Sequence, residues 1–172
     1  ITLLVHNNQI YGLTKGQASP TTPEGFVTKA QPHGVMLEPF NPVATAVLLR
    51  AGFVARGFSG MPDHLAGLIV QAIRHKGFSL VDILQPCVSF NKVNTFAWYK
   101  KRCYELPTDY DPEDWNAAIQ KAQEWGDRIP IGVIYRCQRK TLDEHYMELG
   151  CIRGSDEAAQ REALREIMAK FA

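Results

Sequence analysis

Residues 41–84 decide the fold, and their sequence is NPVATAVLLRAGFVARGFSGMPDHLAGLIVQAIRHKGFSLVDIL. Asn41-Pro42 combines an N-cap residue with proline at the first helical position, so it predicts the start of a helix. Glycines end both predicted helices, at Gly52 and Gly77. The predicted elements are, in chain order, a helix over 43–50, a strand over 53–57, a helix over 62–75 and a strand over 78–84. Strands and helices that alternate with short connections indicate a parallel sheet flanked by helices, of the α/β class.

The chain opens with a further apolar run, Ile1-Thr2-Leu3-Leu4-Val5, which predicts a buried strand of the same parallel sheet. Natural chains rarely begin inside a core strand, and this one begins with Ile, so we expect it to be the C-terminal part of a longer protein. A loop over residues 7–39, rich in Gly, Pro, Thr and Gln, follows the strand. Loops of this length without secondary structure are usually functional, which makes this loop the first candidate for a site.

The second half of the chain is less regular. The predicted elements are a helix or helix-like arm over 93–104, an amphipathic helix over 112–125, a strand over 129–135 and a terminal helix over 155–171. Asp111 and Gly126 bound the amphipathic helix, and Ser155 caps the terminal helix. We expect residues 1–90 to form one domain, and residues 91–172 to form an extension that packs on that domain or on a partner subunit.

Composition excludes several classes of function. The net charge of +1 predicts that neither nucleic acid nor a membrane surface is a partner. No apolar run approaches the roughly 20 residues that span a bilayer. The four cysteines, Cys87, Cys103, Cys137 and Cys151, form no CxxC pair, so they predict neither a self-contained metal site nor a disulfide framework. A reducing, cytoplasmic setting is therefore the expectation.

The loop after the first strand carries residues suited to a metal ion and a phosphate. Asn8 offers a neutral oxygen ligand for a hard cation, and the backbone carbonyl of Ile10 offers a second. Gly12 and Gly16 allow the backbone to approach a phosphate closely, and Lys15 adds a positive charge. A polar loop whose asparagines only form turns is the alternative, and the spacing alone leaves both interpretations open.

Residues 7–22 closely resemble a segment of the β subunits of 2-oxoacid:ferredoxin oxidoreductases, where it follows the Gly-Asp-Gly half of the thiamine-diphosphate motif. The resemblance implies that the Asn8 side chain and the Ile10 carbonyl bind the Mg²⁺ that holds the cofactor's diphosphate. The residues that it places along the cofactor are Gly12, Leu13 and Thr14.

A second segment, Gln85-Pro86-Cys87-Val88-Ser89-Phe90-Asn91, resembles the Pro-Cys-Val-Thr-Phe-Asn element of the same family. In that element the cysteine is the fourth thiolate of a [4Fe–4S] cluster, so the resemblance implies that Cys87 is a cluster ligand. For the other three cysteines we expect the ordinary role of a small buried hydrophobe.

The resemblance implies an incomplete thiamine-diphosphate-binding fold over residues 1–90, with residues 91–172 as a C-terminal extension. Residues 41–77 add an Asn-Pro helix start, a Phe-Val-Ala-Arg strand and a His-Lys-Gly turn that are also similar to the family. The sequence contains neither Gly-Asp-Gly nor a CxxC pair, both of which lie upstream in the family. We therefore expect this chain by itself to assemble neither cofactor and to be inactive.

Members of this family decarboxylate a 2-oxoacid on thiamine diphosphate, pass the acyl group to coenzyme A, and send electrons through the cluster to ferredoxin. The implied cofactors of the complete subunit are thiamine diphosphate, Mg²⁺ and a [4Fe–4S] cluster, and the implied protein partners are an α subunit and ferredoxin. Two alternatives stay open. A non-redox thiamine-diphosphate decarboxylase or synthase would not need Cys87, and a non-catalytic α/β binding module would need neither cofactor.

Lys15 is the residue that we expect to select the substrate. Family members restricted to pyruvate-like acids often carry Gly at the matching position, whereas Gly-Leu-Thr-Lys-Gly-Gln over residues 12–17 resembles members that accept larger acids. An ammonium group there can meet a carboxylate at the far end of the substrate. The alternative is that Lys15 only pairs with the diphosphate or a nearby acid. We predict 2-oxoglutarate or a broad range of 2-oxoacids as substrates.

Overall fold

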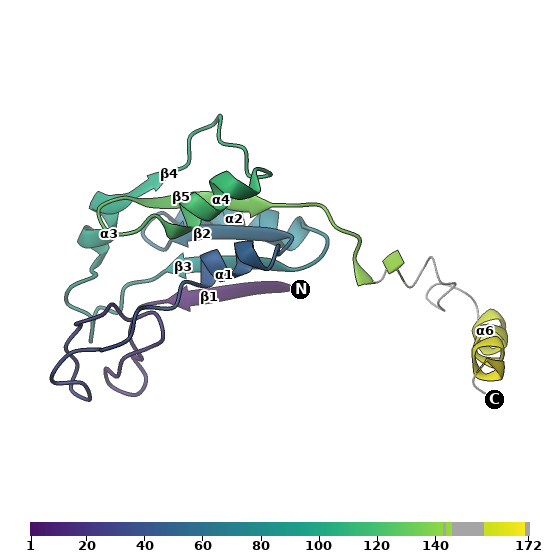
Figure 1. Ribbon diagram of the computed structural model, residues 1–172, viewed down its shortest axis with the longest axis horizontal. Coiled ribbons are helices and arrows are strands. Elements are labelled where there is room, and N and C mark those ends of the chain that lie inside the picture. The colour runs from purple at the N-terminus through teal and green to yellow at the C-terminus, as the bar shows by residue number, and fades with distance from the viewer. Residues whose placement is uncertain (143, 146–156, 171–172) are drawn as a thin grey trace. The chain divides into compact units, whose positions relative to one another are not determined.

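The computed structural model describes residues 1–142, 144–145 and 157–170, and it divides into two units, Ile1–Cys137 and Gln138–Ala172. The first unit contains a five-stranded sheet with strand order β1-β3-β2-β5-β4 (Figure 1). Its elements are β1 (Thr2–Asn7), α1 (Pro42–Leu48), β2 (Phe53–Phe58), α2 (Pro62–Arg74), β3 (Ser79–Leu84), α3 (Phe96–Arg102), β4 (Cys103–Glu105), α4 (Trp115–Gln123) and β5 (Ile129–Arg136).

Strand directions confirm the predicted parallel sheet for its first three strands, because β3 pairs in parallel with β1 on one side and with β2 on the other. The sheet as a whole is mixed, since β5 runs antiparallel to β2 and parallel to β4. Hydrophobic periodicity reports which residues of a strand are buried and carries no information on strand direction. The sequence pattern therefore could not predict the direction of β5.

Helix α1 begins as predicted, with the Asn41 Oδ1 accepting a hydrogen bond from the Ala44 amide at 2.9 Å and Pro42 at the first helical position. Its end differs from the prediction. The helix stops at Leu48, and Arg50, with φ of 53°, takes the left-handed conformation that glycine usually supplies at a helix end. Gly52 lies outside the helix altogether.

Helix α4 is shorter than predicted, because Asp114 and not Asp111 is its cap. The Asp114 carboxylate accepts hydrogen bonds from the Asn116 and Ala117 amides, at 2.9 and 3.1 Å. Asp111 instead accepts from the Glu113 amide at 2.9 Å and so forms a separate turn before the helix. Two aspartates three residues apart offer alternative caps, and the sequence alone does not choose between them.

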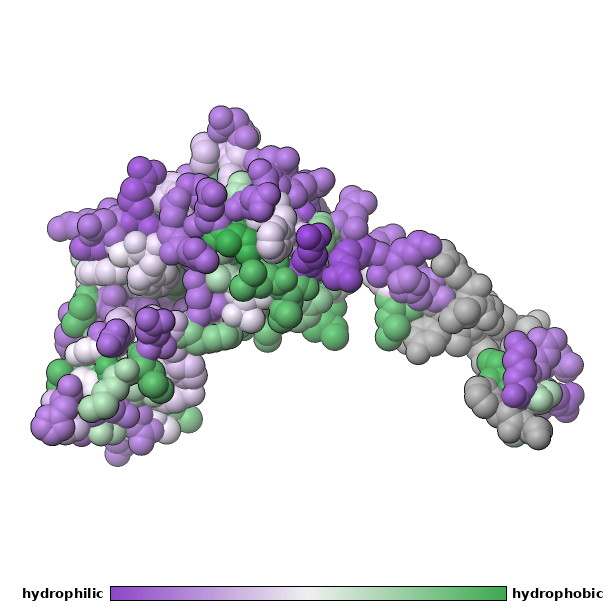
Figure 2. Space-filling view, viewed as in Figure 1, coloured by the Kyte–Doolittle hydropathy of each residue, from purple (hydrophilic) through white to green (hydrophobic). Residues whose placement is uncertain are grey.

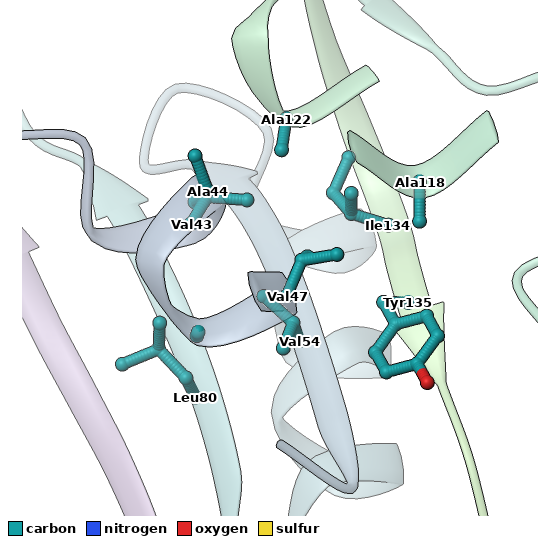
Figure 3. Close-up of a cluster of buried hydrophobic side chains, with 10 residues drawn as sticks. Val43, Ala44, Val47, Val54, Leu80, Ala118, Ala122, Ile134 and Tyr135 are labelled. Carbon is teal, nitrogen blue, oxygen red and sulfur yellow. The ribbon is translucent and has the colours of Figure 1, made fainter. Parts of the chain in front are cut away.

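The core lies on both faces of the sheet. Helices α1 and α4 pack on one face, where Val47 of α1 and Ala122 of α4 meet Val54 of β2 and Ile134 of β5 (Figure 3). Helix α2 packs on the other face, against the strand residues Phe53, Ala55, Val81 and Ile83. Successive residues of β2 thus point to opposite faces, and all six are buried, as expected for a strand covered on both sides.

Strand β1 differs from the prediction of a buried strand. It pairs with β3 only, and Leu3 and Leu4 are 46% and 37% exposed. Figure 2 shows hydrophobic surface along this side of the sheet. Burial of a strand depends on the elements that cover it, so an apolar sequence cannot by itself establish that a strand is central in the chain at hand.

The second unit contains helix α6 (Glu157–Ala169), which confirms the predicted terminal helix over most of its length. The predicted cap Ser155 and the fourth cysteine, Cys151, lie outside the described residues. Among the helices that the structure describes, none has the length and apolar character to cross a membrane.

Candidate functional site

The candidate site lies at the carboxyl ends of β1 and β3, the edge at which open α/β sheets bind ligands. The Gln85 amide donates to the Asn7 carbonyl at 3.0 Å, and the Gln85 Oε1 lies 2.5 Å from the His6 Nδ1. These contacts hold the end of one strand against the end of the other. As a result, the loop after β1 and the cysteine segment after β3 start from neighbouring points.

The beginning of the loop folds back on itself through buried polar contacts. Thr21 Oγ1 donates to the Asn7 Oδ1 at 2.8 Å, and Thr22 Oγ1 donates to the Gln9 carbonyl at 2.7 Å. Asn7, Gln9 and Thr22 are all buried. The conformation of residues 7–10 is therefore fixed by residues more than ten positions further along the chain.

Asn8 and Ile10 occupy one tight turn. The Asn8 Oδ1 accepts a hydrogen bond from the Ile10 amide at 3.1 Å, and the Ile10 side chain is buried, which anchors the backbone on the far side of the turn. Asn8 itself is partly exposed. An amide oxygen and a backbone carbonyl, both uncharged and two residues apart, fit the few protein ligands that Mg²⁺ takes when a phosphate group supplies others.

Residues 11–17 form a small hairpin that carries the remaining predicted residues. The Tyr11 amide donates to the Gln17 carbonyl at 2.8 Å, and the Gly16 amide donates to the Tyr11 carbonyl at 2.9 Å. Lys15, with φ of 70°, adopts the left-handed conformation near the tip, where Leu13 is 99% exposed. The predicted residues Leu13, Thr14 and Lys15 are thus brought together on an exposed tip, and Gly12 lies at the base.

The hairpin packs directly against the cysteine segment. A Cβ atom added to Gly12 would lie 3.4 Å from the Cys87 Sγ, and one added to Gly16 would lie 3.2 Å from Cδ1 of Phe90. Gly16 also has a φ of 99°, which side chains other than glycine's disfavour. The two motifs singled out in the sequence, 75 positions apart from Gly12 to Cys87 (87 minus 12), therefore lie side by side.

The described cysteines differ in their surroundings. Cys87 is partly buried and free of a disulfide. Burial raises the pKa of the Cys103 thiol to about 11, so that thiol stays protonated at neutral pH. The Cys137 Sγ lies 3.7 and 3.8 Å from the carbonyls of Arg50 and Ala51, in a weak contact far along the sheet from the loop. Among the described residues, no three His, Cys, Asp or Glu side chains form a group that could hold a metal ion.

A buried polar layer that we did not predict lies under the loop. Arg56 of β2 and Asp82 of β3 are register partners whose side chains are 1% and 2% exposed, with 3.7 Å between Nε and Oδ2. Arg56 also donates to the Ala122 carbonyl at 3.0 Å. Burial raises the pKa of Asp82, although the Arg56 charge and the Asn7 side chain act in the opposite direction. A charged residue in the middle of each of two core strands was the only sequence signal for this pair.

Comparisons with known proteins follow the same division of the chain. Residues 1–83 match the family model of the C-terminal TPP binding domain of thiamine pyrophosphate enzymes, and residues 87–150 match that of the C-terminal part of the pyruvate ferredoxin oxidoreductase beta subunit. A 2-oxoacid:ferredoxin oxidoreductase subunit beta from Sulfolobus sp is 46% identical over 145 residues, which are 78% of this chain and 48% of the relative. A 2-oxoglutarate oxidoreductase subunit KorB from Mycobacterium tuberculosis is 47% identical over 91 residues, covering 53% of this chain and 24% of the relative.

A solved structure is also similar. It is the 2-oxoglutarate:ferredoxin oxidoreductase from Magnetococcus marinus with 2-oxoglutarate, coenzyme A and succinyl-CoA bound, at a TM-score of 0.84 and 34% identity. The match covers 98% of this chain and 57% of that one. The chain spans about half the length of the curated relatives that match most of it.

Proposed function

Because the chain belongs to the β-subunit family of the 2-oxoacid:ferredoxin oxidoreductases, we propose that it supplies two adjoining parts of such an enzyme's active centre. One part is the loop that holds thiamine diphosphate through Mg²⁺, and the other is a thiolate ligand of a [4Fe–4S] cluster. The observation that carries the proposal is the contact between Gly12 and Cys87, which brings these two parts together.

In the proposed site the Asn8 Oδ1 and the Ile10 carbonyl bind Mg²⁺, and Gly12, Leu13 and Thr14 lie along thiamine diphosphate. The tight turn supports this role, since the hydrogen bond from the Ile10 amide holds the Asn8 Oδ1 against the backbone of Ile10. The exposed Leu13 side chain at the hairpin tip is available to pack on an apolar part of the cofactor or on another subunit. When bound, thiamine diphosphate supplies the carbanion chemistry of decarboxylation.

Cys87 is proposed as one of the cluster's thiolates, with the remaining ligands supplied from outside this chain. Its partial burial suits a cluster ligand that must be shielded from solvent, and its position beside Gly12 puts the cluster next to the cofactor loop. Electrons released at the cofactor would then have a short path toward the cluster. The match of residues 87–150 to a ferredoxin oxidoreductase model favours this redox function over the non-redox thiamine enzyme considered from the sequence.

The proposed reaction converts a 2-oxoacid and coenzyme A into an acyl-CoA, CO₂ and a proton, and the two electrons released reduce ferredoxin. We propose 2-oxoglutarate or a broad range of 2-oxoacids as the substrates, with Lys15 binding the carboxylate at the far end of the substrate. The proposed obligate partner is an α subunit, and the proposed location is the cytoplasm. The names of similar proteins support the substrate and the partners, since they include 2-oxoglutarate oxidoreductases and subunits designated beta.

The proposal is tested on the complete β subunit produced together with its α subunit. Asn8→Ala removes the amide oxygen, so we expect titration calorimetry to show weaker binding of Mg²⁺ and thiamine diphosphate. Asn116→Ala, at an exposed position of α4, is the matched control and should bind both as the unmodified complex does. Equal cofactor affinity in the Asn8 and Asn116 variants would remove Asn8 from the site.

A further inference from the structure

We propose that Tyr99 of α3 is a positioning residue for the turn that carries the Mg²⁺ ligands, acting through Gln9. The Tyr99 hydroxyl donates a hydrogen bond to the Gln9 Oε1 at 3.0 Å, across 90 positions of sequence. Gln9 lies between Asn8 and Ile10 in the chain, so this bond reaches the middle of the turn. The inference rests on the proposed function, because the turn matters only if Asn8 and Ile10 bind the metal.

Gln9 needs an anchor because its backbone is in an unfavourable conformation. Its φ of 56° lies in the left-handed region, which is unfavourable for a residue other than glycine. Gln9 is 3% exposed, and two further contacts hold it: its Nε2 donates to the Thr21 carbonyl at 3.3 Å, and its own carbonyl accepts from Thr22 at 2.7 Å. The Tyr99 hydroxyl completes this set by satisfying the buried amide oxygen.

Tyr99 can serve as an anchor because its ring is itself held. The residue is 1% exposed, and its ring packs edge-on to Trp98 at 4.9 Å and tilted against Phe58 at 5.6 Å between centroids. Thr95 caps the first turn of the same helix through a hydrogen bond from the Trp98 amide. The hydroxyl is therefore presented at a fixed point below the loop.

The same side chain joins the two parts of the proposed site. Helix α3 begins nine residues after Cys87 (96 minus 87), at the end of the segment that packs on the hairpin. Burial raises the pKa of Tyr99 above its usual range, so the hydroxyl remains a hydrogen-bond donor at every pH at which the protein would work. One buried hydrogen bond thus ties the turn to the helix that follows the cysteine segment, in addition to the contact between Gly12 and Cys87.

Tyr99→Phe tests the inference in the complete complex, since it removes the hydroxyl and keeps the ring packing. The variant leaves the Gln9 amide oxygen without its donor. We therefore expect the Mg²⁺ concentration that half-saturates the metal site, measured at saturating thiamine diphosphate, to rise by about 5- to 30-fold. Activity at saturating Mg²⁺ and the iron content should change little. Tyr110→Phe is the matched control, because Tyr110 donates a comparable bond to the Ile134 carbonyl at 2.6 Å, away from the loop. That variant should lose stability without any change in Mg²⁺ dependence.

A second variant separates positioning from a general loss of stability. Gln9→Met keeps the length of the side chain and removes the buried oxygen, so Tyr99→Phe introduced into it should have no further effect on Mg²⁺ dependence. If the Tyr99→Phe complex fails to assemble, Gln9→Met tests the same hydrogen bond by removing its acceptor. We expect the same rise in the Mg²⁺ requirement. Unchanged Mg²⁺ dependence in the single variants, or fully additive effects in the double variant, would overturn the role of Tyr99. An unmodified complex that binds neither Mg²⁺ nor thiamine diphosphate would instead overturn the proposed function, and the inference with it.

Discussion

Residues with the same chemistry receive different roles from their surroundings, and the cysteines illustrate this most clearly. Cys87 and Cys103 are both partly buried, but Cys103 packs against core side chains of β2, β3 and β5, whereas Cys87 lies beside Gly12 of the hairpin. Burial raises the pKa of the Cys103 thiol, which disfavours the thiolate form that binds iron. These surroundings support the proposed role of Cys87 as a cluster ligand.

We predict that Cys87→Ala in the complete enzyme loses or degrades the [4Fe–4S] cluster. Cys103→Ala and Cys137→Ala should keep it, since the Cys103 side chain packs against the core and the Cys137 Sγ lies against the Arg50 and Ala51 carbonyls. Iron content and visible absorption of the three purified variants would decide the matter. A full complement of iron in the Cys87 variant would show that the cluster is bound elsewhere.

Lys15 carries the prediction on substrate choice. If its ammonium meets the distal carboxylate, Lys15→Ala should lower kcat/KM for 2-oxoglutarate by about one to two decades more than for pyruvate, the effect of losing one charge-assisted hydrogen bond. Lys29→Ala, an exposed lysine of the same long loop, serves as the control. Equal losses for the two acids would mean that Lys15 serves the cofactor and not the substrate.

At this scale the sequence suggests a role where a short segment resembles a family motif, and it suggests none where the proposed role depends on a distant contact. Asn8, Ile10 and Cys87 could be proposed because the short segments that contain them resemble motifs of the family. Tyr99 could not, since its only functional sign is a hydrogen bond to a residue 90 positions away. A buried tyrosine in an aromatic helix is, by its sequence, simply part of the core.

Among the elements, the central strands β2 and β3 combine apolar packing with one buried charge each. Arg56 and Asp82 face each other across the two strands, and neither is open to solvent. Removing one member of such a pair leaves a buried charge without its partner, which lowers the free energy of unfolding strongly. Replacing both members by apolar side chains changes the free energy of unfolding far less.

We predict that Asp82→Ala lowers the free energy of unfolding by about 3–5 kcal/mol, the range for breaking a buried ion pair. Glu113→Ala provides the comparison, because Glu113 pairs with Arg136 at 3.5 Å with side chains that are 59% and 47% exposed. That exposed pair should contribute only about 0–1 kcal/mol. Urea unfolding of the two variants measures the difference, and similar losses in both would mean that the Arg56–Asp82 pair is not energetically special.

Local signals predicted the existence of most elements better than their ends or directions. The Asn41-Pro42 signal gave the start of α1 correctly, because the cap is formed by residues adjacent in sequence. The choice of Asp114 over Asp111 and the antiparallel direction of β5 were missed. Both aspartates fit the local pattern of a cap, and the direction of β5 depends on its pairing with β2, which a local pattern does not contain.

For the whole molecule, the fold brings two motifs that are far apart in the chain to the same edge of the sheet. Parallel pairing of β1 and β3 brings their carboxyl ends to the same edge, and the loop after one strand then meets the cysteine segment after the other. We keep as a prediction that this chain without the rest of its subunit is inactive. We therefore expect the active centre to be complete only in the assembled enzyme.

The measurement that tests this account most directly is substrate-driven reduction of the cluster in the complete enzyme, followed by electron paramagnetic resonance. Under anaerobic conditions, 2-oxoglutarate and coenzyme A should produce the signal of a reduced [4Fe–4S] cluster in the unmodified complex. In Asn8→Ala the two substrates should produce little signal, because the variant binds Mg²⁺ and thiamine diphosphate weakly. Dithionite should still produce the full signal, because the cluster remains. A complex that shows no cluster signal with either reductant, or an Asn8 variant that the substrates reduce as fully as the unmodified enzyme, would contradict the account.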